Sequence, residues 1–295
     1  MPSALSRFTV TDGRHFRLRR MDPRGGAHLR LKKEDAADAL AKTVGRIADL
    51  QEQLYAHHRW GVLLIFQAMD AAGKDSAIKH VLSGVNPQGC QVSSFKVPSA
   101  EELDHDFLWR TTARLPERGR IGVFNRSYYE EVLVVRVHPE LLQRQGLPAE
   151  VMTPRLWEER YEDIAGFERH LARSGFVIRK FFLNVSEEEQ RERFLARLDT
   201  PDKRWKFSPG DIKERARWAD YMAAYEEMIR HTSAPHAPWI VVPADRKWLA
   251  HHVVSTAVVE ALESIDFRGP ASPGPTRREL ALARQALTAP AKKRR

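Results

Sequence analysis

A lysine that follows a loop of small residues is the first feature of this sequence with clear chemical meaning. The loop spans residues 68–73, and Lys74 comes directly after Gly73. An apolar run, 62–66, precedes the loop, and a helix-compatible run, 75–82, follows it. In this order the loop N–H groups converge on an anion, the helix N-terminus adds its dipole, and the lysine adds a full charge. The stretch predicts a phosphate site made by Ala71, Ala72, Gly73, Lys74, Asp75 and Ser76.

The stretch departs from the phosphate-loop pattern G-x-x-x-x-G-K-[ST] at two places. Ala68 stands where the first glycine belongs, and Asp75 stands where the hydroxyl residue belongs, with Ser76 one place late. Because that hydroxyl normally contacts Mg²⁺, the metal needs another ligand here. Asp70 is a carboxylate inside the loop, so we predict that it binds the metal. The alternative is a plain strand–turn–helix with an exposed lysine.

A second polar group follows the predicted strand 120–124. In an α/β sheet, ligands bind outside the carboxyl ends of the strands, so this group should face the loop. We expect Asn125 to hold a metal-bound water or a phosphate oxygen. Arg126 should clamp the transferring phosphoryl group, because a guanidinium matches phosphate geometry. An ordinary surface ion pair is the alternative for Arg126. Lys96 and Arg136 are further candidate phosphate contacts.

A cationic loop lies between two predicted helices at about 199–210. It carries Lys203, Arg204 and Lys206, interleaved with Trp205 and Phe207. A mobile lid at this place would bring positive charge onto the developing phosphoryl charge and expel water. At an effective dielectric constant of about 20, two unit charges 4 Å apart gain roughly 4 kcal/mol, against about 1 in water. A solvated basic turn is the alternative, although it has little use for two aromatic residues.

Strand-like and helix-like segments alternate along the chain, which predicts an α/β fold with a parallel sheet covered on both faces. The expected strands are 62–66, 91–95, 120–124, 176–183 and 239–242. The expected helices are 34–55, 75–82, 99–114, 128–137, 153–171, 186–198, 211–231 and 248–265, and the helix at 128–137 is expected to run into a loop at 138–139. Ser99 and Glu102 form the pattern of a capping box, and Thr153 and Ser186 are expected helix caps.

The chain divides into three parts by composition. We predict an irregular N-terminal arm at 1–33, one domain at 34–265, and a basic tail at 266–295 with one short helix at 277–287. The formal net charge is +9, which favours polyanionic partners. A single cysteine and the lack of a long apolar run predict a cytoplasmic protein without a membrane span.

Three blocks together resemble the polyphosphate kinase 2 family. They are MDAAGKDS at 69–76 as a Walker A element, FNRSYYEEVLV at 124–134 as a Walker B element, and KRWKFSPGD at 203–211 as a lid. The segments 83–99 and 237–248 also match, so the resemblance spans about 35–265. It implies a P-loop kinase fold like that of thymidylate kinase, with five parallel strands and a helical lid.

The resemblance also implies an activity. Family members transfer phosphoryl groups between inorganic polyphosphate and nucleotides with Mg²⁺, for which Mn²⁺ substitutes, and a homo-oligomer, dimer or tetramer, is expected. Carried over by position, Asp70 and Lys74 serve the Walker A site, Arg126 is a catalytic phosphate contact, and Lys203, Arg204 and Lys206 belong to the lid. Many members have Asp where this chain has Asn125, which leaves Asp70 as the main metal ligand. Similarity to the class III subgroup makes AMP and ADP the expected acceptors, with ATP as product and a reversible reaction.

Two other functions stay open at this point. An ATP-dependent nucleoside or nucleotide kinase on the same fold would use ATP and ignore polyphosphate. A non-enzymatic polyanion-binding protein would need the basic charge but not the acidic Asp70 inside the phosphate loop. We expect no specific nucleic acid and no membrane as partners.

Overall fold

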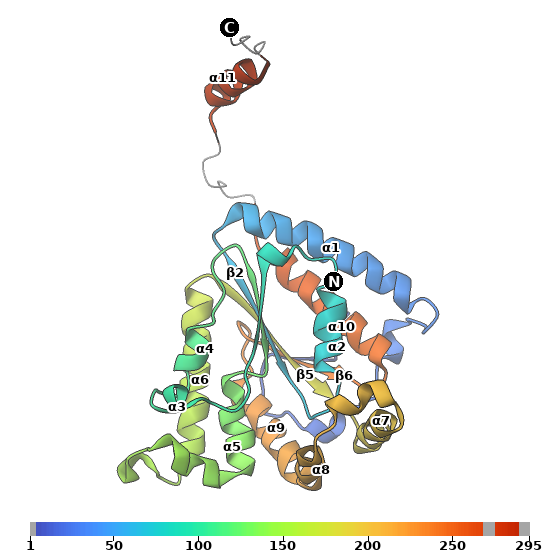
Figure 1. Cartoon of the computed structure of the whole chain (residues 1–295), viewed down its shortest axis with the longest axis vertical. Helices are drawn as coiled ribbons and strands as arrows, with labels where there is room; N and C mark the ends of the chain where they lie inside the picture. The colour runs from blue at the N-terminus through green and yellow to red at the C-terminus, as the bar shows by residue number, and fades with distance from the viewer. Residues whose placement is uncertain (1–3, 268–274, 289–295) are drawn as a thin grey trace.

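A six-stranded sheet runs through the centre of the computed structural model, which describes residues 4–267 and 275–288 (Figure 1). The strand order is β1-β6-β5-β2-β4-β3, and all pairs are parallel except β1 with β6. The strands are β1 (Thr9–Val10), β2 (Gly61–Gln67), β3 (Cys90–Ser94), β4 (Ile121–Asn125), β5 (Phe176–Asn184) and β6 (Trp239–Pro243). The five predicted parallel strands are therefore present. The sheet also contains a sixth strand, the antiparallel edge strand β1, which was not predicted.

Helices cover both faces of this sheet. One layer consists of α1 (Ala36–His57), α2 (Lys74–Val81) and α10 (Lys247–Glu263), and the other of α5 (Val134–Val137), α6 (Leu156–Arg173) and α9 (Trp218–Thr232) (Figure 1). No helix in the described ranges is long and apolar enough to cross a membrane.

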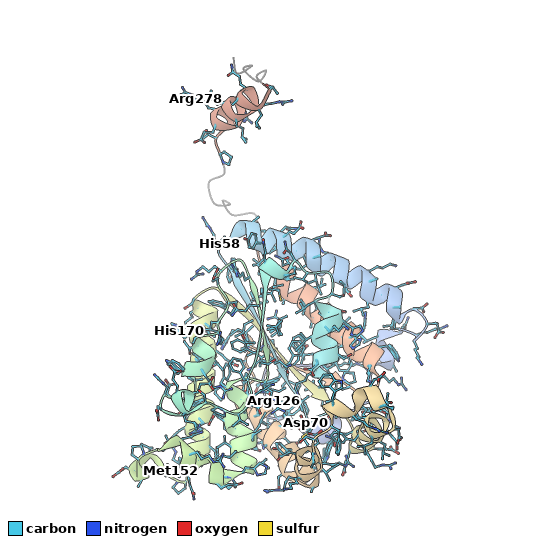
Figure 2. The ribbon with its side chains drawn as sticks, viewed as in Figure 1. His58, Asp70, Arg126, Met152, His170 and Arg278 are labelled. Atoms are coloured by element: carbon cyan, nitrogen blue, oxygen red, sulfur yellow. The ribbon has the colours of Figure 1, made fainter. Side chains whose placement is uncertain are left out.

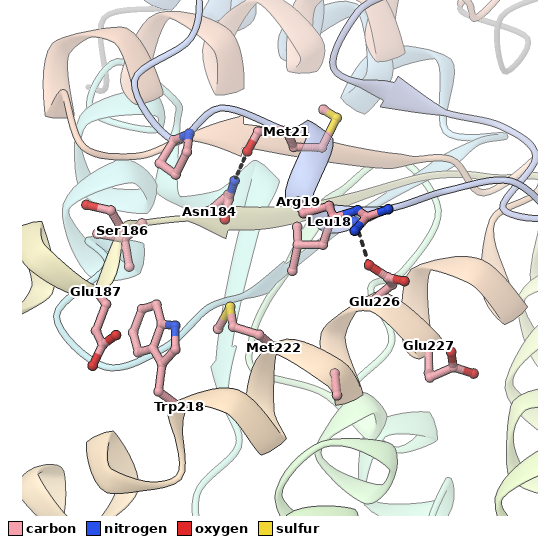
Figure 3. Close-up of a pocket in the computed structure, with 13 residues that line it drawn as sticks. Leu18, Arg19, Met21, Asn184, Ser186, Glu187, Trp218, Met222, Glu226 and Glu227 are labelled. Atoms are coloured by element: carbon pink, nitrogen blue, oxygen red, sulfur yellow. Dashed lines mark hydrogen bonds between the residues drawn. The ribbon is translucent and has the colours of Figure 1, made fainter.

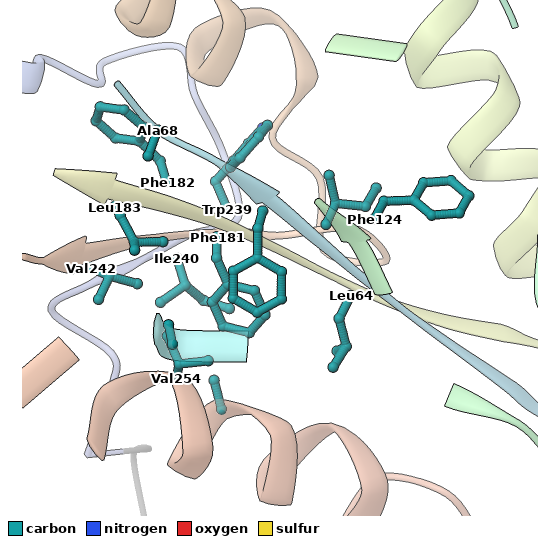
Figure 4. Packing of buried hydrophobic residues seen from close by; sticks show 14 of the residues in the cluster. Leu64, Ala68, Phe124, Phe181, Phe182, Leu183, Trp239, Ile240, Val242 and Val254 are labelled. Atoms are coloured by element: carbon teal, nitrogen blue, oxygen red, sulfur yellow. The ribbon is translucent and has the colours of Figure 1, made fainter. Parts of the chain in front are cut away.

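The core fills the space between the sheet and its two helical layers. All seven residues of β2 are buried, as expected for a central parallel strand. The rings of Phe66 and Phe181 stack with centroids 4.7 Å apart. Figure 4 shows Phe181, Ile240 and Val254 in one such cluster, with the α10 residue below the strands. This packing fixes the carboxyl ends of β2 and β4, where the polar candidates begin.

Three predicted helices are each divided in two, and the one expected at 128–137 consists of the 3₁₀ segment η4 (Tyr128–Val132) and α5. The expected helix at 99–114 consists of α3 (Ala100–Leu103), with the predicted capping box, and α4 (Trp109–Thr112). They separate because the Asp106 carboxylate accepts a hydrogen bond from Leu108 N, forming a turn. The expected helix at 211–231 consists of α8 (Pro209–Ala216) and α9, which separate at Arg217, where φ is −96° and ψ is 21°. α6 begins at Leu156, two residues after the proline at which the sequence pattern places its start.

The remaining elements are short or lie outside the sheet layers. α7 (Glu187–Asp199) is capped by Ser186 as predicted, and α11 (Arg277–Thr288) is the predicted tail helix. Seven 3₁₀ segments occur in the described chain: η1 (Leu18–Arg20), η2 (Ala27–Leu29), η3 (Pro87–Gly89), η4 (Tyr128–Val132), η5 (Pro139–Gln145), η6 (Ala149–Val151) and η7 (Pro201–Lys206).

The N-terminal arm is packed against the body along much of its length. Leu5, Phe8 and Phe16 are buried in the common core. The arm also forms one wall of a pocket of about 570 Å³ at the carboxyl end of β5, opposite Trp218 and Met222 (Figure 3). Two hydrogen bonds fix that wall, from Asn184 Nδ2 to Met21 O at 2.9 Å and from Leu18 N to Glu226 Oε2 at 2.7 Å. The arm has little regular structure beyond β1, η1 and η2, and its buried apolar residues explain why it packs against the body.

Candidate active site

The loop between β2 and α2 has the backbone shape of an anion cradle. Ala71 and Gly73 both have positive φ, 62° and 107°, so the chain reverses twice before α2 begins at Lys74. Glycine adopts this conformation freely, whereas alanine is strained in it. Lys74 Nζ donates to Ala68 O at 3.0 Å, which folds the lysine back over the loop. The ammonium group therefore stands beside the loop that the sequence predicts to bind phosphate.

Two buried side chains of α7 hold the carbonyl groups of this loop. Gln190 Nε2 donates to Asp70 O at 2.9 Å. Arg193 Nη1 donates to Ala71 O at 3.0 Å and to Ala72 O at 2.7 Å, and its Nη2 donates to Ala244 O at 2.6 Å. A loop can direct its N–H groups to an anion only if its carbonyl groups find other donors, and these side chains supply them.

Gln190 and Arg193 were not among the residues predicted for the site. The available signal was a pair of polar residues at i and i+3 on the inward face of an amphipathic helix. Both are almost fully buried, with exposed fractions of 1% and 8%. Buried polar side chains need partners, so that face had to meet backbone or charge.

Arg126 and Asp70 meet between the carboxyl ends of β4 and β2 (Figure 2). Arg126 Nη2 lies 3.0 Å from Asp70 Oδ1, and Arg126 Nη1 lies 3.4 Å from Glu130 Oε2. Arg126 has a φ of 65°, and its N–H bonds to Phe66 O at 3.0 Å, which joins the two strand ends. A strained arginine held between two carboxylates is an oriented cation, a common feature of functional sites.

The charges of this cluster perturb one another. Burial lowers the pKa of Lys74, and the nearby Arg126 lowers it further. Burial raises the pKa of the Glu130 carboxyl, although Arg126 and Lys74 oppose that rise. The negative charge of Glu130, and to a smaller extent that of Asp70, raises the pKa of Arg126. Groups that are desolvated and charge-coupled in this way are typical of catalytic sites, because bringing them together costs folding free energy.

A divalent metal is compatible with this carboxylate arrangement. No group of three or more His, Cys, Asp or Glu side chains within 4–267 and 275–288 could hold a metal by itself. Mg²⁺ usually binds through only one or two carboxylates, together with substrate phosphates and water. Asp70 meets that requirement, because Arg126 contacts only its Oδ1 atom. Asn125 Nδ2 donates to Asp75 Oδ1 at 2.7 Å, so a second carboxylate stands at the mouth of the loop.

The other predicted site residues are more dispersed. Ser76 Oγ lies 3.2 Å from His251 Nε2, so its hydroxyl faces α10 rather than the loop. Arg136 Nη1 donates to Tyr161 OH, which holds it between α5 and α6. Lys96 is exposed on the segment after β3.

Arg204 Nε donates to Leu198 O at 2.8 Å, which turns it back onto α7. The side chains of Lys203 and Lys206 lie outside the described part of the structure.

The predicted lid is held between α7 and α8, with η7 at its tip. Arg215 of α8 donates from Nη1 to Gln190 Oε1 at 2.8 Å and to Glu187 O at 2.8 Å. Gln190 in turn contacts Asp70 O. One continuous chain of hydrogen bonds therefore leads from the far side of the lid to the backbone of Asp70.

A buried polar network positions η4, the segment that carries Glu130. Lys180 Nζ, fully buried, donates to Glu168 Oε2 at 2.6 Å, to Tyr129 OH at 3.0 Å and to Thr232 O at 2.7 Å. Glu168 Oε1 accepts hydrogen bonds from Tyr128 OH and Tyr129 OH, both at 2.8 Å. A buried charge pair with this many partners fixes a geometry, and here it fixes the turn after β4.

Comparison with known proteins agrees with these features. The profile of the polyphosphate kinase 2 family matches residues 30–269. An ADP-polyphosphate phosphotransferase of Rhodopseudomonas palustris is 56% identical over 256 residues, which cover 86% of this chain and 89% of the relative. An AMP/ADP-polyphosphate phosphotransferase of Meiothermus ruber is 46% identical over 259 residues, covering 88% and 92%. The crystal structure of polyphosphate kinase 2 from Arthrobacter aurescens superposes with a TM-score of 0.87 at 39% identity, covering 96% and 97% of the two chains.

Proposed function

The chain belongs to the polyphosphate kinase 2 family, and from this premise we propose that it transfers phosphoryl groups from inorganic polyphosphate to ADP and AMP, forming ATP. The observation that carries the proposal is the meeting of Lys74, Asp70 and Arg126 at the adjoining ends of β2 and β4. Relatives named for ADP and for both AMP and ADP support the choice of acceptor. The reaction is reversible in principle, since it exchanges one phosphoanhydride bond for another.

The transfer needs positioning and charge more than it needs covalent help from the protein. An oxygen of the acceptor's terminal phosphate attacks the terminal phosphorus of polyphosphate, and the bridging P–O bond to the rest of the chain breaks. That oxygen is already deprotonated at neutral pH, so the step requires no general base. The loop N–H groups and Lys74 bind the donor phosphates, while Arg126 stabilises the charge of the phosphoryl group in transit.

We assign Asp70 as the residue that would hold Mg²⁺, with Mn²⁺ as a substitute. Such an ion neutralises phosphate charge and orients the oxygens it contacts. Asp70 also holds Arg126, so the carboxylate sets the position of both cations. Gln190 and Arg193 act on the backbone and keep the loop in the shape that offers its N–H groups.

The experiment that tests this function measures ATP formation from AMP or ADP with polyphosphate and Mg²⁺. We expect ATP from both acceptors, and none when polyphosphate or the metal is left out. The alternative, an ATP-dependent nucleotide kinase on this fold, would instead phosphorylate a nucleoside or nucleotide with ATP and remain inactive with polyphosphate. We also propose a homo-oligomer, which light scattering of the purified protein measures directly.

A further inference from the structure

Gln67 is a fully buried polar residue at the edge of the site, and the proposed mechanism has not used it. It is the last residue of β2, so the phosphate loop begins directly after it. Its exposed fraction is 0%, and every other residue of the strand is apolar or glycine. A buried amide needs partners for both its oxygen and its NH₂ group. The partners of this amide therefore indicate its role.

The amide of Gln67 lies between Ser127 and Glu130, which both follow β4. In one orientation of the amide, Nε2 donates to Glu130 Oε1 at 2.9 Å, and the amide oxygen accepts from Ser127 N at 3.3 Å and from Ser127 Oγ at 3.1 Å. In the opposite orientation, Nε2 donates to Ser127 Oγ at 3.1 Å, and the amide oxygen faces the Glu130 carboxyl. Two oxygens make a hydrogen bond there only if Glu130 carries a proton. The first orientation is therefore the one that fits an ionised Glu130.

The second oxygen of the Glu130 carboxyl faces Arg126. Arg126 Nη1 lies 3.4 Å from Glu130 Oε2, so the carboxyl connects the buried amide to the guanidinium group. Arg126 also pairs with Asp70, but a metal ion held by Asp70 would compete for that carboxylate. Glu130 is then the partner that keeps the guanidinium in place while the metal is bound.

Several charged or titratable groups face Glu130 from the phosphate loop, α2, the end of β4 and α9. They are Asp70, Lys74, Arg126, Tyr221 and Tyr225. Burial raises the pKa of both tyrosines, so they are neutral at physiological pH. Burial also raises the pKa of Glu130, and the two cations and the hydrogen bond from Gln67 oppose that rise.

We propose that Gln67 is a positioning residue for phosphoryl transfer: its amide binds and orients the Glu130 carboxylate, which in turn holds Arg126 toward the phosphate loop. This inference rests on the proposed function, in which Arg126 stabilises the phosphoryl group in transit. Gln67 itself does not touch the substrates. Its effect should therefore appear in kcat and not in the KM for ADP or for polyphosphate.

The protonation state of Glu130 distinguishes this role from simple packing. An N–H donor favours the charged form of a carboxyl, so loss of Gln67 should raise the pKa of Glu130. Glu130 would then take up its proton at a higher pH as the solution is acidified, and Arg126 would lose its counter-charge. The loss of rate should therefore be large at low pH and should diminish as the pH rises. A packing defect would instead lower the rate by the same factor at every pH.

The test compares Gln67→Met with the wild type, because methionine has a similar length and volume but no N–H group. Gln51→Met is the matched control. Gln51 is also buried, with an exposed fraction of 2%, but it lies on α1 and packs against Gly89, just before the amino end of β3. If Gln67→Met does not fold, Gln67→Asn replaces it, since its amide is one methylene too short to reach Glu130.

Two measurements are made on each protein, and thermal melts verify that it is folded. The first is kcat and KM with ADP and polyphosphate as a function of pH. The phosphates of the substrates titrate equally in every assay, so differences between the proteins arise from the proteins. The second is an NMR titration of the carboxyl carbon of Glu130, whose resonance is identified by its absence in Glu130→Gln.

We expect Gln67→Met to lower kcat at neutral pH by about tenfold, the usual effect of losing a hydrogen bond to a charged group, with both KM values nearly unchanged. The acid limb of kcat and the titration of Glu130 should both move to higher pH, while Gln51→Met matches the wild type. Added to Glu130→Gln, the Gln67→Met change should have no pH-dependent effect.

An unchanged titration of Glu130 in folded Gln67→Met would overturn the proposal. So would a loss of kcat that is the same at every pH, or an equal shift in Gln51→Met. A wild-type protein that makes no ATP from polyphosphate would refute the proposed function instead, and the NMR titration would still decide whether Gln67 controls Glu130.

Discussion

At the scale of single residues, Lys74, which we propose as a phosphate ligand, lowers the stability of the folded protein. Burial lowers its pKa, so the charged form is disfavoured in the folded state relative to the unfolded chain. This loss of folding free energy is fully present at neutral pH. It disappears as the pH rises past about 10.4, the pKa of lysine in the unfolded chain. A residue kept under such conditions is better explained by its chemistry than by its packing.

Lys74→Ala should therefore reduce kcat/KM by orders of magnitude and leave the folded protein at least nearly as stable, because it removes a partly desolvated charge. Paired activity assays and thermal melts at pH 7 measure both effects. In the wild type, kcat/KM should fall on the alkaline side at a pH below 10.4, as the lysine loses its proton. A Lys74→Ala protein with native stability and more than a third of the wild-type activity would remove Lys74 from the mechanism.

Asp70 pairs with Arg126 and is the residue that we propose as the metal ligand. Asp70→Asn should lower kcat strongly and raise the Mg²⁺ concentration needed for half-maximal activity, because the amide is a weaker ligand and no longer pairs with Arg126. Mg²⁺ titrations of the two proteins at saturating polyphosphate make the comparison. Superimposable titration curves would show that Asp70 is not a metal ligand.

At the scale of elements, α7 connects the predicted lid to the phosphate loop. Arg215 contacts Gln190, and Gln190 contacts Asp70 O, so the two side chains should act as one unit. We predict that Arg215→Met and Gln190→Leu each lower kcat/KM for polyphosphate. The double variant should be no worse than Gln190→Leu alone, since Arg215 acts through Gln190.

Kinetics of the four proteins in this double-mutant cycle give the coupling directly. Arg118→Met is a suitable control, because Arg118 also donates to a backbone carbonyl, that of Arg59 at 2.7 Å, but near the amino end of β2. It should leave kcat/KM unchanged. If the losses of kcat/KM caused by Arg215→Met and Gln190→Leu simply multiply in the double variant, the hydrogen bonds do not couple the lid to the loop.

At the scale of the whole molecule, the pair Lys180–Glu168 joins the sheet to the layer of α6 and α9. Lys180→Met should lower the free energy of unfolding by about 3–5 kcal/mol, because it leaves Glu168 buried without its counter-charge. Combining it with Glu168→Gln should recover part of that loss. Urea unfolding measures this free energy for both variants. As a control, Arg46→Met breaks the exposed ion pair with Glu263 and should lower the free energy of unfolding by less than about 1 kcal/mol. Equal losses at the two sites would show that the buried network has no special weight.

The sequence alone was sufficient to predict the parallel strands and the principal polar residues of the site, because the signals for both are local. Apolar runs and capping residues are local signals, and so is the small-residue loop before Lys74. The edge strand β1 was missed because two residues make no periodic pattern, and only pairing with β6 orders them. The break at Asp106 depends on a local side-chain hydrogen bond that competes with a helix, and at the break at Arg217 the side chain donates to the distant Val137 O.

Within the candidate site, the residues that could not be predicted are those whose side chains bond to distant backbone atoms. Asp70, Lys74 and Arg126 are recognisable by residue type and by their place after a strand. Arg193 has no such mark, because its role comes from carbonyl groups that only the folded chain brings to it. Such residues are found by asking which buried donors supply a loop whose own N–H groups are reserved for a ligand.

The bond between Arg193 and the phosphate loop also has a consequence for the order of events during synthesis. Arg193 lies 121 residues after Ala72, whose carbonyl it holds. At about 5–20 residues per second, a ribosome adds Arg193 roughly 6–24 s after Ala72. During that interval the nascent chain has the whole phosphate-loop sequence but not the donor that shapes it. The loop therefore reaches its final shape only after translation has passed α7, so the proposed polyphosphate site is not preformed while β2 is being synthesised.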